Sequence, residues 1–171
     1  MIRERLPGVA VKKLHKLLYF AQGHHLAAFG QPLFSESVSA WDMGPVVGQL
    51  WRSEKEGSPP PGAVPSLSEA QLNTIGYVLA RYGRMSGRDL EILSHGQRPW
   101  QRADEKRGLS GRVRIEDEWM RDFFSEPDAD DEGALDPVQV TAWLRNSSEQ
   151  LTDEPRVDDL RDVRARIAAL A

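Results

Sequence analysis

The sequence predicts a mainly α fold, namely a compact helical domain with a small two-stranded β element, followed by a C-terminal acidic linker and short helices. Three observations support this prediction. In several segments apolar residues recur every three or four positions, which is the period of an α-helix. Two short stretches instead alternate polar and apolar residues, as half-buried strands do. After Ser125 the composition changes to an acidic stretch with almost no apolar residues.

The clearest predicted element is a helix over Val9–Phe29. Its apolar residues fall at helical spacing, and Lys12, Lys13 and Lys16 are expected on the opposite side of the helix. Gly30 is placed to end the helix in a left-handed conformation. Because the apolar stripe is wide, we expect this helix to be the central core helix.

Between residues 31 and 125, short elements alternate with turns. Proline and glycine fill residues 57–65 (GSPPPGAVP), so this segment is expected to be a loop. Serine side chains at N-cap positions indicate two helix starts. The predicted elements are a strand over Ser35–Trp41 that Gly44-Pro45 ends, a helix over Val46–Glu56, a helix from Ser68 to Tyr82, a helix over Met85–His95 with Ser86 as its N-cap, a strand over Arg112–Ile115, and an apolar segment over Ile115–Phe124.

Residues 1–125 are expected to form the folded domain, and residues 126–171 an acidic linker with a helical appendage. Leu135–Leu144 and Val157–Leu170 have the apolar spacing of short amphipathic helices. Such helices need a surface to pack on, which could be the domain, a second copy of the chain or another protein. A homo-oligomer therefore stays open at this stage.

Charge is distributed unevenly along the chain. Residues 1–114 hold 16 Lys/Arg and 10 Asp/Glu, a net charge of +6, whereas residues 115–171 hold 6 and 16, a net charge of −10. This asymmetry favours an anionic partner for the basic part or folding-back of the acidic tail, unless the charges are simply solvated. Residues 81–114 alone carry nine Lys/Arg and four Asp/Glu. DNA binding through them is less favoured because no helix-turn-helix pattern accompanies them.

Composition and motifs argue against several classes of protein. The absence of cysteine removes disulfides, Fe–S clusters and thiolate nucleophiles. No apolar run is long enough for a membrane helix and the N-terminus lacks a signal-peptide core, so a cytoplasmic protein without membrane contact is expected. The sequence has neither a phosphate-binding glycine loop nor a nucleophile elbow. We therefore expect no catalytic residues, no cofactor and no metal, and hence no enzyme.

The four histidines are the residues best able to serve a metal or an enzyme. His15 and His24 are expected on opposite sides of one helix, and His24 and His25 diverge by about 100°. No pair has the four-residue helical spacing of a zinc site. We expect these three and His95 to be structural or surface residues.

Three ordered blocks of residues stand out within residues 8–125. The first is KLLYFAQG at residues 16–23, continued by His25-Leu26 and by GQPLF at residues 30–34. The second is AW-x-x-GPVV at residues 40–47, and the third runs from Ser86 through Leu90, His95 and Pro99-Trp100 to Ala103. In this order and at these intervals, the blocks resemble the Panacea, or SocA-like, antitoxin domain.

The resemblance implies a helical domain that binds and silences a cognate toxin protein encoded by an adjacent gene. Toxins paired with this domain vary in chemistry, so the resemblance does not name the toxin. It marks the family-motif residues for the fold or for toxin binding, and we expect most of them to maintain the fold. These residues are Lys16, Leu17, Leu18, Tyr19, Gln22, His25, Trp41, Gly44, Pro45, Val46, His95, Pro99 and Trp100.

Two further hypotheses stay beside the antitoxin. One is a transcriptional autoregulator or a proteolytic adaptor, which would use the basic residues 81–114 or bind a partner protein. The other is an enzyme that uses the histidines with a metal or a small molecule. For an antitoxin, the acidic tail could fill the basic groove of a toxin that acts on RNA or nucleotides.

Overall fold

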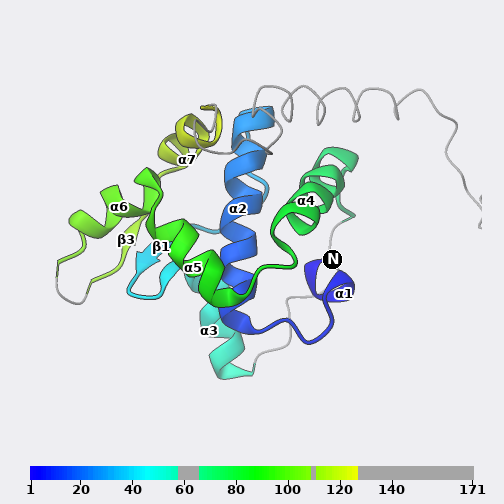
Figure 1. Ribbon diagram of the computed structural model, residues 1–171, viewed down its shortest axis with the longest axis horizontal. Helices are drawn as coiled ribbons and strands as arrows, with labels where there is room; N and C mark the ends of the chain where they lie inside the picture. Colours follow the sequence, from blue (N-terminus) through cyan, green and yellow to red (C-terminus); the bar gives the residue numbers. More distant parts are fainter. Residues whose placement is uncertain (58–65, 109–110, 127–171) are drawn as a thin grey trace, which may run out of the picture.

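In the computed structural model, residues 1–57, 66–108 and 111–126 are described, and within them shorter helices surround one long helix (Figure 1). The predicted mainly α fold is confirmed, although the sheet has three strands instead of the predicted two. The predicted loop at 57–65 and the appendage at 126–171 lie almost wholly outside the described residues. The elements are α1 (Ile2–Arg5), α2 (Val11–Phe29), β1 (Val38–Trp41), β2 (Gly44–Val47), α3 (Gly48–Glu56), α4 (Glu69–Tyr82), α5 (Gly87–His95), α6 (Arg98–Glu105), β3 (Val113–Arg114) and α7 (Asp117–Phe124).

Helix α2 is the central element, as its apolar spacing predicts. It contacts α4, α5 and α7 (Figure 1) and also β2, and Leu17, Tyr19 and Phe20 on it are fully buried. It ends at Gly30, whose φ of 68° is left-handed as expected. The position predicted for Lys16 is wrong, because its side chain is only 1% exposed. Strand β2 and helix α5 contact this helix and each other, and together they cover a side that the sequence pattern assigns to solvent.

Helices α2 and α7 approach closely at Gly23. A Cβ atom at this position would lie 2.2 Å from the ring of Phe124, so only glycine leaves room for that ring. The ring also packs edge-on against Tyr19 and Phe20, at centroid distances of 5.7 and 6.2 Å. Gly23 therefore fixes how α7 sits on the central helix.

The three-stranded sheet has the order β2-β1-β3, and both of its strand pairs are antiparallel. The strands predicted at Ser35–Trp41 and Arg112–Ile115 appear as β1 and β3, and they pair through Ser39 with Arg114 and Ala40 with Val113. A third strand, β2, pairs with the other side of β1 and is an edge strand. Proline has no N–H to donate to a strand ladder and is tolerated at sheet edges, which suits Pro45.

Two predictions around this hairpin are wrong. Gly44-Pro45 does not end the β structure but begins β2, and Val46 lies in that strand instead of a helix. Helix α3 starts only at Gly48. The reason is cross-strand pairing, since Val46 and Val47 oppose Ser39 and Val38 of β1 and β-branched residues suit such positions.

The helix starts around the third motif block agree with the sequence. Ser68 and Ser86 cap α4 and α5 through capping boxes, each serine oxygen accepting a backbone N–H bond three residues on. Pro99 lies in the first turn of α6, so Pro99-Trp100 restarts a helix after α5. The four-residue α1 has no signal in the apolar pattern and was not predicted.

Candidate functional site

Part of the motif holds the loop after α2 in place. The Gln22 Oε1 atom accepts hydrogen bonds from the Leu33 N–H at 3.0 Å and the Phe34 N–H at 3.2 Å, and its Nε2 donates to the Phe34 carbonyl at 3.2 Å. Gln22 is 1% exposed. Its amide oxygen thus accepts two hydrogen bonds and its amide nitrogen donates one within the fold.

The histidines on α2 also have partners inside the fold. The Thr74 hydroxyl donates to the Ala70 carbonyl at 2.9 Å, so at His25 it accepts from Nδ1–H, likewise at 2.9 Å. His24 Nε2 lies 3.0 Å from the Tyr82 hydroxyl. Burial lowers the pKa of His25 to about 4 and that of His24 as well, so both rings are neutral at pH 7. Among the residues that the structure describes, no group of three His, Asp or Glu could hold a metal ion.

The other motif residues meet where the hairpin of β1 and β2 crosses α2. The Lys16 Nζ atom donates to the Pro45 carbonyl at 3.1 Å. Gly44 lies against this lysine with a φ of 91°, and a Cβ on it would be 3.1 Å from Lys16 Nζ and 3.2 Å from His95 Nε2. The His95 ring stacks on Trp100 with the centroids 3.9 Å apart. Residues from all three motif blocks therefore form one cluster, which contains Lys16, Gly44, Pro45, His95 and Trp100.

Beside this cluster lies an open cavity of about 300 Å³, which we call the hairpin cavity. Two apolar side chains on it are unusually exposed, Met43 at 54% and Val11 at 38%. The Trp41 and Trp51 rings pack against each other there, with centroids 5.1 Å apart. The lining residues are Val11, Lys12, His15, Lys16, Trp41, Asp42, Met43, Val46 and Trp51.

Hydrogen-bond donors around the hairpin cavity outnumber the acceptors that they reach. The His15 Nδ1 atom accepts from the Val47 N–H at 3.3 Å, so the proton of the neutral ring is on Nε2. His15 Nε2 and Trp41 Nε1 are buried and have no partner in the described part of the chain. Lys16 has three N–H bonds to donate and one acceptor, the Pro45 carbonyl, within the same residues.

Burial governs the charges at this site. Loss of hydration lowers the pKa of Lys16 to about 8 and that of His15 to about 4, so Lys16 is largely charged and His15 neutral at pH 7. The other charged lining residues are already paired, Lys12 with Glu91 and Asp42 with Arg107. Among the described residues Lys16 has no such counter-charge within ion-pair distance.

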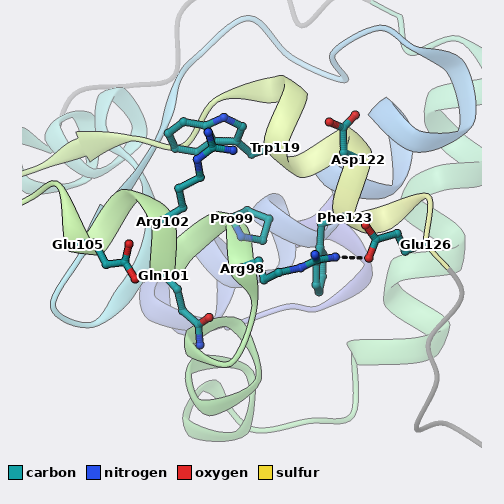
Figure 2. Close-up of a pocket in the computed structure, with 9 residues that line it drawn as sticks. All are labelled: Arg98, Pro99, Gln101, Arg102, Glu105, Trp119, Asp122, Phe123 and Glu126. Carbon is teal, nitrogen blue, oxygen red and sulfur yellow. Dashed lines mark hydrogen bonds and ion pairs between the residues drawn. The ribbon is translucent and has the colours of Figure 1, made fainter.

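A second open cavity, of about 410 Å³, lies between α6 and α7 (Figure 2). Figure 2 shows the Arg102 side chain lying along the Trp119 ring, with its guanidinium 4.4 Å from the ring centroid. Arg98 extends past Phe123 and forms an ion pair with Glu126. The cations of this groove are thus engaged by neighbours, which distinguishes it from the hairpin cavity.

Several of the basic residues at 81–114 form ion pairs within the fold. Arg88 pairs with Glu91, Arg107 with Asp42 and Asp104, and Arg114 with Glu116 and Asp117. Less uncompensated positive charge remains than the sequence count indicates. The structure therefore adds nothing in favour of a phosphate-binding surface here.

Comparison with known families decides what the chain is. Residues 14–101 match the family described as antitoxin SocA-like, Panacea domain. The chain belongs to this family. The match spans about half of the chain and contains the whole motif cluster, from Lys16 on α2 to Trp100 on α6. No curated protein and no solved structure gives a match.

The Panacea domain of this chain shows which site residues the sequence did not reveal. Val11, Met43 and Trp51 come from the start of α2, the hairpin turn and α3, and only the fold brings them to one cavity. An apolar residue at a hairpin turn, Met43, is the one signal that could have been noticed.

In the described ranges no helix is both long and apolar enough to cross a membrane.

Proposed function

We propose that this chain is the antitoxin of a bacterial toxin–antitoxin pair and neutralises its cognate toxin by direct protein–protein binding. Membership of the SocA-like antitoxin family supports this role. In this proposal an adjacent gene encodes the toxin, both proteins are cytoplasmic, and inhibition is steric, with no catalysis by the antitoxin. Residues 1–125 form the antitoxin domain and residues 126–171 its acidic appendage.

The rim of the hairpin cavity is the surface to which we assign toxin binding. Met43 and Val11 expose apolar atoms beside Lys16, a buried cation with no ion-pair partner among the described residues, and such a combination is typical of a surface that a partner covers. The adjoining Trp41 and Trp51 are of the residue type that most often anchors protein interfaces. The groove between α6 and α7 is less suited, because its charged groups already bind one another.

A growth assay tests the proposal. The adjacent gene is expressed in a heterologous bacterium alone, with this chain, and with two variants that each place a glutamine at an exposed apolar position. Met43→Gln changes the cavity rim, whereas Ile92→Gln changes a residue of similar exposure, 59%, on α5 outside the cavity lining.

We expect the neighbour alone to arrest growth, and the wild type and Ile92→Gln to restore it. Met43→Gln is expected to restore growth weakly at matched protein level, since interface anchors contribute about 2 kcal/mol or more to binding. A harmless neighbour would contradict the antitoxin role. Equal rescue by the two variants would place the toxin on another surface.

A further inference from the structure

The side chains around the hairpin cavity define what kind of ligand can complete it. Lys16 Nζ, His15 Nε2 and Trp41 Nε1 all carry hydrogen atoms that lack a full set of acceptors among the described residues. The one lining carboxylate, that of Asp42, is 80% exposed and binds Arg107. A ligand that completes these interactions must therefore supply acceptors, and Lys16 favours one with a negative charge.

The remaining walls restrict the ligand further. Val11, Met43, Val46 and the two indole rings present carbon surface, so a group bearing the charge must carry apolar atoms next to it. One ammonium group also matches one negative charge. A phosphate monoester, with almost two charges and three strong acceptor oxygens, would leave charge buried without a partner.

We propose that the hairpin cavity binds the carboxylate of an acidic side chain that projects from an apolar segment of the toxin, with the Lys16 ammonium as its counter-ion. The inference rests on the proposed function for the identity of the partner. His15 Nε2–H and Trp41 Nε1–H supply neutral donors to the same carboxylate, and the apolar rim covers the flanking residues of the segment. A carboxylate desolvated in this way gains from charge-assisted hydrogen bonds.

The ligand chemistry is tested without the toxin. The full-length chain is titrated with 3-phenylpropionate, which joins one carboxylate to an apolar group, and with the neutral 3-phenylpropionamide as the matched control. Binding is followed by the NMR signal of the Trp41 indole N–H, which a Trp41→Phe variant assigns. The carboxylate is expected to shift this signal and to bind at least tenfold more tightly than the amide.

Two lysine variants locate the counter-ion. Lys16→Met removes the charge at the cavity, and Lys13→Met removes a neighbouring α2 lysine that likewise donates to a backbone carbonyl, that of Gly83 at 2.7 Å, but does not line the cavity. Lys16→Met is expected to weaken carboxylate binding at least tenfold and Lys13→Met less than twofold. Trp41→Phe keeps Lys16 and is followed instead by the indole N–H signal of Trp51, which lines the same cavity. It is expected to weaken carboxylate binding about threefold and serves if Lys16→Met does not fold.

The outcomes separate this inference from the antitoxin role. Equal binding of acid and amide, no binding of either, or equal effects of the two lysine variants would overturn the carboxylate site. In the growth assay, Lys16→Met should fail to neutralise the toxin while Lys13→Met succeeds. Full rescue by Lys16→Met would overturn the inference and leave the antitoxin role standing, whereas failure of the wild type would contradict only the latter.

Discussion

At the scale of single residues, Lys16 stands out because its burial works against folding. Its side chain is 1% exposed, and within the described residues its ammonium has one carbonyl as acceptor. Desolvation is the largest cause of its lowered pKa, while nearby Glu91 raises the value and Lys12 lowers it further. A buried ammonium group that lowers the stability of the fold is better explained by ligand binding than by a contribution to stability.

The first prediction concerns the stability of Lys16→Met. A pKa lowered from 10.5 to about 8 corresponds to about 3 kcal/mol against folding, and loss of the bond to Pro45 offsets about 1 kcal/mol of this. The variant should therefore be more stable than the wild type by about 1–2 kcal/mol at pH 7 in urea unfolding, and Lys13→Met less stable by about 1 kcal/mol.

The sign of the pH dependence follows from the same pKa. Below pH 8 both the folded and the unfolded wild type are protonated at Lys16, so the full penalty is present. Between pH 8 and 10.5 the folded state releases its proton first and the wild type gains stability. The advantage of Lys16→Met should therefore shrink over this range, and an advantage that grows with pH would contradict the assignment.

The sequence predicted which residues belong to the site better than it predicted the burial and contacts of those residues. The family motif marks Lys16, Trp41 and Gly44, and all three lie at or beside the candidate site. Helical periodicity nevertheless assigns Lys16 to the polar side, because a one-dimensional pattern cannot show that a distant hairpin covers that side. The unpaired donors of His15 and Trp41 depend on tertiary contacts in the same way.

At the scale of elements, the contact of α2 with α7 gives the second prediction. Gly23→Ala should lower stability by about 1–3 kcal/mol, because its Cβ would overlap the Phe124 ring. Gly76→Ala is the control, since this α4 glycine has nothing within 4 Å of its Cβ position and alanine favours helices. It should raise stability by up to about 1 kcal/mol. Equal urea midpoints for the two variants would refute the close approach.

Local signals predicted the helices better than the sheet. The starts of α4 and α5 follow from the serine caps, which act within three residues. Strand β2 was mistaken for the start of a helix because Val46 and Val47 form a short apolar run whose pairing with β1 is not visible in its own spacing. As a consequence, the predicted helix began at Val46, two residues before the observed start of α3 at Gly48.

At the scale of the whole molecule, the acidic tail gives the third prediction. Residues 126–171 hold twelve Asp/Glu and five Arg, and a toxin that acts on nucleic acid would present a basic groove to them. Removing these residues should weaken neutralisation and reduce the salt dependence of toxin binding. Unchanged affinity and salt dependence for the truncated chain would limit toxin binding to the domain.

Direct binding is the central claim, and calorimetry of the purified chain with the product of the adjacent gene tests it most directly. We predict a stoichiometric complex whose dissociation constant rises at least tenfold in Met43→Gln and less than twofold in Ile92→Gln, because only Met43 lines the hairpin cavity. Absence of a complex between the wild-type proteins, with growth still restored in the cell, would contradict the account.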